Sequence, residues 1–242
     1  MLVRTDDGRA NIEAANTTTY SLRRVGRPYT KDYTIYFEQT KDGTPVSPFH
    51  DISLYHDKHK GIFNMISRSK SLNPITQDRE DDGSLRFNRN IFTYKGYLWN
   101  YGALPQLIVI DVNDPLVSKL SDIDDVERYF PGLLDATRDW FRIYKIPEGH
   151  DPNDFAFAGM YRSKKYALKI VGEYNDAWKG LVKGKIKPEK VSLDNTTLKD
   201  TPGKLDPKKI ELPPDEELSP VHLDKKLDDW YFVDRKTWKE SP

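Results

Sequence analysis

The stretch from residue 85 to residue 105, LRFNRNIFTYKGYLWNYGALP, contains side chains that are well suited to holding a small anion. Arg86 lies between two apolar residues, which predicts a short strand over residues 85–89 with the guanidinium on the opposite face. Tyr97 and Tyr101 each lie beside a glycine, which allows close approach of the backbone to a ligand. A guanidinium and two phenols suit a multi-oxygen anion, although aromatic residues are equally common in the core of ordinary strands.

The composition limits the class of protein. The chain has 242 residues, which is enough for one sizeable domain. Lys and Arg together equal Asp and Glu at 38 each, and this balance argues against nucleic acid or an anionic membrane as the main partner. The absence of cysteine excludes disulfides and thiolate metal sites, and no apolar run approaches membrane-spanning length.

The N-terminal segment, residues 1–19, is polar and has no hydrophobic period, so we expect a flexible leader there. It lacks the apolar region of a secretory signal. Its acidic residues Asp6, Asp7 and Glu13 are unusual in a mitochondrial transit peptide. The cytoplasm is the default expectation for the compartment, with mitochondria as the alternative.

Short extended segments are predicted in the first third of the chain. Residues 33–37 are rich in β-forming side chains, and the KDGTP sequence at 41–45 predicts a turn after them. Residues 46–54 are expected to be extended, and the proline within them argues against a central strand. An apolar run at 62–65 predicts another strand.

Helical patterns follow in the middle of the chain. Ser121 or Asp122 is expected to cap a short helix over residues 123–130. Apolar residues at intervals of three and four predict two amphipathic helices, over residues 132–145 and 164–182. Together with the strands, this pattern predicts a domain over residues 20–183 that is mainly β with packed helices.

Residues 184–242 carry many prolines among charged residues, which predicts a long tail that runs over the surface of the domain. The three adjacent aromatic residues 230–232 are expected to dock the end of this tail, because such a group is rarely left in solvent.

A short acidic motif, residues 111–115 (DVNDP), resembles a metal-binding sequence only superficially. The position where a final carboxylate would be needed is Val117, so we interpret the motif as a strand end followed by an Asx-type turn into Pro115. The five histidines also lack metal-ligand spacing. The residues themselves therefore predict no metal site.

As a string, the stretch at 85–105 closely resembles the eukaryotic-type soluble (family I) inorganic pyrophosphatases, which read K-L-R-[FY]-V-x-N-x-F-P-x-x-G-Y-I-x-N-Y-G-A-[LI]-P-Q. Residues 46–54, VSPFHDISL, are similar to the family's V-S-x-F-H-D-I-P-L. The aromatic residues 230–232 are similar to its terminal D-K-W-[FY]. The resemblance extends over roughly residues 20–238.

The resemblance implies a reaction, a cofactor and a fold. Members hydrolyse diphosphate to two phosphates with Mg²⁺, occur in the cytoplasm and in mitochondria, and are commonly homodimers. Their α+β fold is built on a closed, OB-like five-stranded β-barrel with helices packed outside it. The positions of this chain that match the family's diphosphate contacts are Arg86, Tyr97, Tyr101, Tyr144 and Lys145.

Two passages of the family are missing from this chain. After Met65 it lacks a hairpin that carries two glutamates and a lysine of the family's active site, and after Gln106 it lacks the D-N-D-P-[IL]-D metal motif. We therefore assign no catalytic residue and no metal ligand, and expect an incomplete barrel with impaired hydrolysis. A splice form and an incomplete gene sequence both fit the breaks. A non-enzymatic relative that binds phosphate compounds or pairs with a full-length subunit fits them as well.

Overall fold

The structure is a computed structural model, and it describes residues 19–52, 55–57, 62–63, 71–77, 79–80, 82–96, 107–111, 114–223 and 225–234. The leader expected at the N-terminus and the tyrosines Tyr97 and Tyr101 fall outside these residues, apart from residue 19.

Four strands form an antiparallel sheet on one side of the molecule. They are β1 (Tyr20–Val25), β2 (Thr34–Gln39), β3 (Pro45–Val46) and β6 (Ile75–Thr76). β1 pairs along the whole of β2, whereas β3 and β6 pair with opposite ends of its other edge. Two more short strands, β4 (Tyr55–Asp57) and β5 (Ile62–Phe63), pair with each other. The expected strand near residues 33–37 and the turn after it are confirmed.

The extended segment expected over residues 46–54 ends early, at Val46. The backbone then turns, and the N–H groups of His50 and Asp51 donate to the carbonyl of Ser47 at 3.2 and 2.8 Å. The Asp51 carboxylate accepts a hydrogen bond from the Ser47 N–H at 2.8 Å and closes the turn. A short acidic side chain that bonds to a nearby backbone N–H competes with strand formation in this way.

The three predicted helices are confirmed. They are α1 (Ile123–Tyr129), α2 (Leu133–Ile143) and α3 (Lys164–Val182). Asp122 caps α1 and forms a capping box with Asp125, and hydrogen bonds from Ser121 lower the pKa of the Asp125 carboxyl. The buried residues of α2 are Leu134, Thr137, Trp140 and Ile143. The predicted apolar face was right at Trp140 and Ile143, but Leu133 and Ala136, which the pattern of threes and fours also placed on it, are only partly buried.

The prediction of a strand over residues 85–89 is wrong, because the strand lies just after these residues. Leu85 forms only an isolated bridge with Arg79, and the strand is β7 (Asn90–Ile91), which pairs in parallel with β8 (Trp230–Tyr231). The Asn90 side chain strengthens this pairing, because it donates to the carbonyls of Leu227 and Asp229 at 2.9 and 3.3 Å. The position of the strand is thus determined by a partner more than a hundred residues away, which alternation along the sequence does not reveal.

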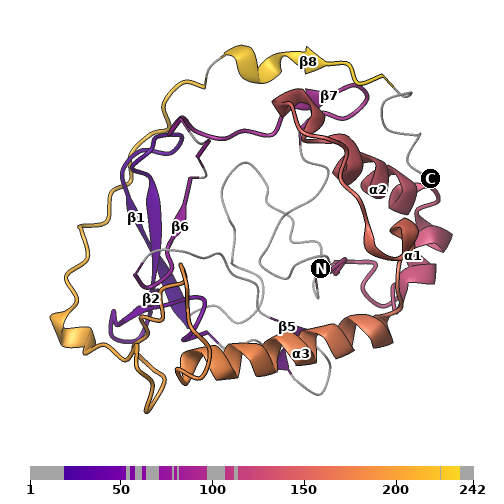
Figure 1. The fold of residues 1–242 in the computed structure, drawn as a ribbon. Coiled ribbons are helices and arrows are strands. Elements are labelled where there is room, and N and C mark those ends of the chain that lie inside the picture. The colour runs from indigo at the N-terminus through magenta and orange to yellow at the C-terminus, as the bar shows by residue number, and fades with distance from the viewer. Residues whose placement is uncertain are drawn as a thin grey trace.

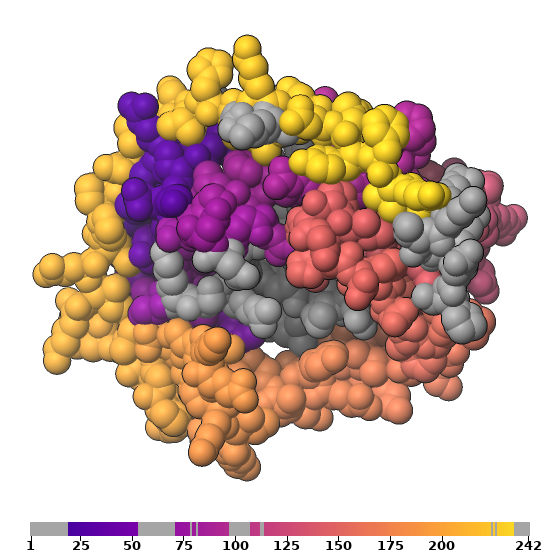
Figure 2. Space-filling view, turned by 45° about the horizontal axis from the view of Figure 1, so that its top comes forward, coloured from indigo at the N-terminus to yellow at the C-terminus, as the bar shows by residue number. Residues whose placement is uncertain are grey.

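The C-terminal segment passes along the outside of the sheet before it reaches β8 (Figures 1 and 2). The Glu216 N–H donates to the Arg24 carbonyl at 2.7 Å, and the Val221 N–H donates to the Pro28 carbonyl at 3.2 Å. Two 3₁₀ turns interrupt the segment, at η3 (Pro207–Lys209) and η4 (Lys225–Asp228). The end of the tail docks through β8, but the expected removal of the aromatic run from solvent is wrong for two of its residues, because Trp230 and Phe232 remain 45% and 78% exposed.

Figure 1 shows the sheet and the pair α1 and α2 on opposite sides, with α3 extending between them. Within the described ranges the sheet is open, which agrees with the expected incomplete barrel in an α+β architecture. A small core of Ile91 and Ile143 joins β7 to α2. Among the described residues, the helices are too short or too polar to cross a membrane.

Candidate phosphate-binding site

Arg86 follows a tight turn over residues 80–84. The Glu80 N–H donates to the Ser84 carbonyl at 3.0 Å, and the Ser84 N–H donates to the Asp82 carboxylate at 2.7 Å. Hydrogen bonding to Ser84 lowers the pKa of Asp82, so its carboxylate keeps its charge and closes the turn. The turn brings Glu80 back to Arg86, with 4.0 Å between Glu80 Oε1 and the guanidinium Nε.

A second carboxylate connects Arg86 to the other candidate residues. Glu148 Oε2 lies 3.5 Å from a terminal guanidinium nitrogen of Arg86. Glu148 belongs to the one-turn 3₁₀ helix η1 (Ile146–Glu148), and its backbone N–H donates to the Lys145 carbonyl at 3.0 Å. The structure therefore brings Arg86 to the turn that carries Lys145.

Tyr144 and Lys145 follow directly after α2. The ring of Tyr144 stacks on Trp140 with centroids 4.8 Å apart and planes at 11°, and it packs against the Ile91–Ile143 core. The Lys145 ammonium lies 5.6 Å from the centroid of the Tyr144 ring. A lysine at the end of a helix often hydrogen-bonds to the last helix carbonyls. Within the described part of the chain the Lys145 ammonium makes no such bond, and it contacts the Tyr144 ring instead.

Trp140 also connects this group to the tyrosine-rich stretch. Its indole N–H donates to the Gly96 carbonyl at 3.0 Å, and Gly96 has a positive φ of 62°. Gly96 directly precedes Tyr97. The position of Tyr97 and Tyr101 relative to Arg86 lies outside the described residues, so both remain predictions.

The described residues do not fit an Mg²⁺ site. Mg²⁺ requires several oxygen ligands, and among residues whose placement is described no three acidic or histidine side chains gather. Asp114 forms the expected Asx-type turn, whereas the expected strand end is wrong, because residues 107–111 form no strand. The Asp114 N–H donates to the Asp111 carbonyl at 3.0 Å, and the Asp114 carboxylate accepts from the Leu116 N–H at 2.8 Å.

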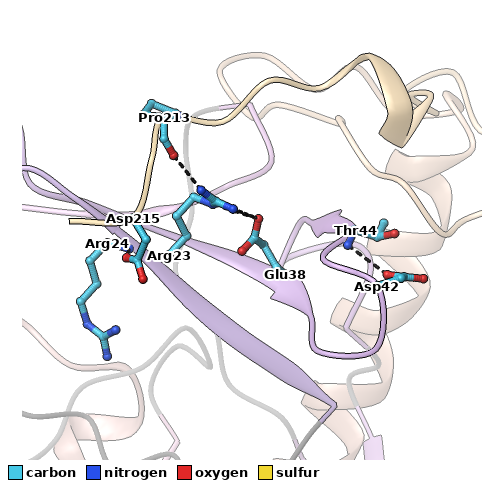
Figure 3. Close-up of polar contacts among 7 residues, drawn as sticks. All are labelled: Arg23, Arg24, Glu38, Asp42, Thr44, Pro213 and Asp215. Atoms are coloured by element: carbon cyan, nitrogen blue, oxygen red, sulfur yellow. Dashed lines mark hydrogen bonds and ion pairs between the residues drawn. The ribbon is translucent and has the colours of Figure 1, made fainter. Parts of the chain in front are cut away.

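An open groove of about 810 Å³ lies elsewhere, between the β2–β3 turn and the tail segment 207–212. Its lining contains none of the candidate residues. Arg23 on this groove is already engaged, because it donates to Glu38 at 2.9 Å and to the Pro213 carbonyl at 3.0 Å (Figure 3). In this groove, the charges of Arg23 and Glu38 are thus already paired with each other.

The sequence reasoning did not identify Glu80, Trp140 or Glu148 as part of this site. Trp140 lies within the amphipathic helix predicted over residues 132–145, where it counts as one of the apolar positions. The signal that was available for Glu148 is its place three residues after Lys145 on a turn that Pro147 and Gly149 define. The ion pair with Arg86 joins segments far apart in the sequence, and no local pattern indicates it.

Comparison with known proteins places this chain among relatives of one family. A family model described as inorganic pyrophosphatase matches residues 106–179. The inorganic pyrophosphatases of Neurospora crassa and Emericella nidulans are each 40% identical to this chain, over 88% and 89% of it and over 97% and 98% of their own length. The solved inorganic pyrophosphatase of Schistosoma japonicum superposes with a TM-score of 0.75 at 26% identity, over 88% of this chain and 100% of that one. The Trypanosoma brucei brucei enzyme gives a TM-score of 0.55 at 25% identity, over 71% and 72% of the two chains.

The chain belongs to the inorganic pyrophosphatase family. The alignment with the Neurospora crassa protein has 284 positions, but it takes in only 88% of the 242 residues here, which is about 213. About 70 positions of that alignment (284 minus 213) therefore have no residue in this chain.

Proposed function

We propose that this chain binds inorganic diphosphate and phosphate through Arg86, Tyr144 and Lys145, together with Tyr97 and Tyr101, and that it hydrolyses Mg²⁺–diphosphate only weakly. The observation that carries the proposal is the ion pair between Arg86 and Glu148, because it holds the guanidinium on the turn that presents Lys145. Arginine and lysine next to phenols are the groups that bind the oxygens of a phosphoryl anion.

Weak turnover follows from what hydrolysis needs. Divalent metals neutralise the substrate and activate a water, and they require a cluster of carboxylates. The family's clustered aspartates are implied, by resemblance, to lie in passages that this chain lacks. The roughly 70 alignment positions without a residue here support this reading. The chain would thus keep much of the family's phosphate binding without its metal centre.

The proposal is tested by calorimetric titration with diphosphate in the absence of metal, followed by phosphate release with Mg²⁺. Arg86→Ala is expected to weaken diphosphate binding by about tenfold, because it removes a charge-assisted contact. Arg128→Ala, on the exposed face of α1, is the matched control and should bind like the wild type. Equal binding by Arg86→Ala and wild type would reject the site. Rapid phosphate release that Arg86→Ala abolishes would instead show that hydrolysis is retained.

We propose further that the chain forms a dimer with a second copy of itself. The observation behind this is the aromatic patch of Phe92, Trp230 and Phe232. The Phe92 ring lies 5.4 Å from Phe232 and 6.5 Å from Trp230, yet all three side chains stay substantially exposed. An exposed cluster of large apolar rings typically marks a protein contact. The frequent homodimers of the resembled family support the choice of partner.

Sedimentation velocity over a range of concentrations tests this pairing. Phe232→Ser should shift the chain toward monomer, and Met160→Ser, which removes another exposed apolar side chain, should not. A full-length pyrophosphatase subunit added in excess provides the second arm, because heterodimers would assign the chain a non-enzymatic, partner role. Monomers in every mixture would overturn the proposal.

For the compartment we propose the cytoplasm, supported by the acidic residues near the N-terminus and the absence of cysteine. Imaging of the tagged chain tests this, and a mitochondrial signal would contradict it.

A further inference from the structure

We propose that the Glu148 carboxylate competes with the ligand for Arg86 and thereby limits the affinity of the site for highly charged anions. This inference rests on the proposed diphosphate binding and deepens it. Glu148 Oε2 lies 3.5 Å from the Arg86 guanidinium, and only 13% of the Glu148 side chain is exposed. The carboxylate therefore occupies one face of the group that is expected to hold phosphate.

Glu148 is held in place by its own turn. Pro147 lies within the first positions of η1 and restricts the backbone, and Gly149 ends the turn with a positive φ of 85°. The Glu148 N–H is bonded to the Lys145 carbonyl, so the carboxylate and the lysine belong to one rigid turn. A ligand that reaches both Arg86 and Lys145 must therefore bind close to the Glu148 charge.

Of the two carboxylates described beside Arg86, that of Glu80 interacts more weakly. Its distance to the guanidinium is 4.0 Å, against 3.5 Å for Glu148, and its side chain is 36% exposed. Solvent screens an exposed charge more strongly than a half-buried one. Among the described residues of the site, Arg86 and Lys145 carry two positive charges, and Glu80 and Glu148 carry two negative ones.

The consequence depends on the charge of the ligand. Repulsion between Glu148 and a bound anion grows with the number of charges on that anion. Diphosphate should therefore be weakened more than phosphate. A carboxylate whose only task is to position Arg86 would have the opposite effect, because its removal would weaken both ligands.

The test is calorimetric titration of the full chain with diphosphate and with inorganic phosphate, without metal, at low and high salt. Glu148→Gln is expected to raise the affinity for diphosphate by about tenfold and that for phosphate by about threefold at low salt, with a smaller gain at high salt. Glu173→Gln on α3 removes the same charge from an exposed ion pair with Lys169 and should change neither affinity.

Two further variants separate charge from shape. Glu148→Asp keeps the charge and should stay within about twofold of wild type, whereas Glu80→Gln should give a gain of about twofold for diphosphate. Thermal unfolding shows whether Glu148→Gln folds. If it does not, the diphosphate affinity of Glu80→Gln tests whether a carboxylate beside Arg86 weakens diphosphate binding. Unchanged or weaker diphosphate binding by the folded glutamine variants overturns the inference.

The wild type and Arg86→Ala distinguish the two levels of the proposal. Equal binding by these two proteins means that the proposed function fails. Weaker binding by Arg86→Ala together with no gain in Glu148→Gln means that only the competition by Glu148 fails.

Discussion

The junction between the sheet and the tail differs from the candidate phosphate site in how its polar groups are satisfied. We call the turn at residues 47–51 and the loop at 192–197 the sheet–tail junction. Its polar residues Ser47, His50 and Thr196 are at most 5% exposed. Ser47 donates to Asn73 at 2.6 Å, and the Thr196 hydroxyl donates to the Pro45 carbonyl at 2.6 Å. Short hydrogen bonds within the chain satisfy the buried groups.

The two ion pairs described for Arg86 in the candidate phosphate site are longer than the hydrogen bonds of the junction. The Arg86 side chain is 33% exposed, and the two carboxylates described beside it, those of Glu148 and Glu80, lie at 3.5 and 4.0 Å. Ion pairs at such distances and exposures contribute little to stability, so they can exchange a partner for a ligand at small cost. The comparison indicates that the junction stabilises the fold, whereas the candidate phosphate site has charged groups that are available to bind a ligand.

The largest effect on stability is expected at Asp51, whose carboxylate connects the two segments of the sheet–tail junction. Its carboxylate accepts hydrogen bonds from the N–H groups of Ser47, Thr196 and Thr197 at 2.7 to 3.0 Å. Asp51→Asn replaces one accepting oxygen with a donor that faces these N–H groups. We expect the free energy of unfolding in urea to fall by about 3 kcal/mol. Asp200→Asn, at an exposed position in the same tail, should change it by less than about 0.5 kcal/mol. Similar losses for the two variants would contradict the special role of the junction.

A smaller effect is expected at Asp122, which joins two helices far from the junction. Its carboxylate caps α1 through the Ile123 N–H at 2.7 Å and also accepts from the Lys164 N–H at the start of α3 at 2.6 Å. Asp122→Ala should lower the free energy of unfolding by about 2 kcal/mol, because both helices lose a partner for a terminal N–H group. Asp124→Ala, in the first turn of α1, is the control and should cost well under 1 kcal/mol. If Asp122→Ala and Asp124→Ala lowered the free energy of unfolding equally, the hydrogen bonds of Asp122 to α1 and α3 would not be important for stability.

The third prediction uses the pH dependence of the junction. The Trp178 indole donates to His50 Nδ1 at 3.2 Å, and His50 Nε2 lies 2.7 Å from the Ser192 carbonyl, so the ring is neutral with its proton on Nε2. Burial is the main cause that lowers the pKa of His50, against opposing contributions from Ser192, Asp51 and Asp194. Below about pH 6.5 the unfolded chain therefore binds more protons than the folded one.

Stability from this group is complete above the unfolded pKa and is lost as the pH falls through about 6.5 toward the lower folded pKa. The loss between pH 7.5 and 5.5 can be at most about 1.4 kcal/mol, which the unfolded histidine alone sets. Urea unfolding at the two pH values measures it, and His50→Gln should lack this component of the pH dependence. His150→Gln, at an exposed position, should retain it. A pH dependence that is the same in His50→Gln as in wild type would refute the assignment.

The elements that could be predicted from the sequence are those that depend on local spacing. α3 begins and ends where its pattern predicts, and Asp122 is one of the two residues that were expected to cap α1. The turn over residues 41–45 and the Asx turn at Asp114 follow from short-range hydrogen bonding in the same way. In each case the deciding partner lies within a few residues.

The features that the sequence did not reveal depend on distant partners. β7 lies at Asn90 instead of residues 85–89 because β8 pairs there. The segment after Val46 turns because Asp51 bonds to Ser47, and Thr196 and Thr197 hold the same carboxylate from the tail. Glu148 meets Arg86 only through the fold. The family resemblance identified the candidate residues, but it did not reveal the carboxylates that surround Arg86.

The smallest effect on stability is expected for Tyr144→Phe, which sharpens the comparison most directly. The Tyr144 ring packs on Trp140, while among the described residues its hydroxyl has no hydrogen-bond partner. Phenylalanine keeps the packing, so the free energy of unfolding should change by less than about 0.5 kcal/mol. Diphosphate affinity should fall about fivefold, because a phenol that contacts the anion is lost.

Tyr161→Phe is the matched control with the reverse pattern. The Tyr161 hydroxyl donates to the Leu134 carbonyl at 2.5 Å, and burial raises its pKa. Removal of this hydroxyl should cost about 1 kcal/mol of stability and leave diphosphate affinity unchanged. Urea unfolding and calorimetric titration of both variants complete the comparison. If Tyr144→Phe lost stability and kept its affinity, Tyr144 would be a structural residue, and the proposed phosphate site would reduce to Arg86, Tyr97, Tyr101 and Lys145.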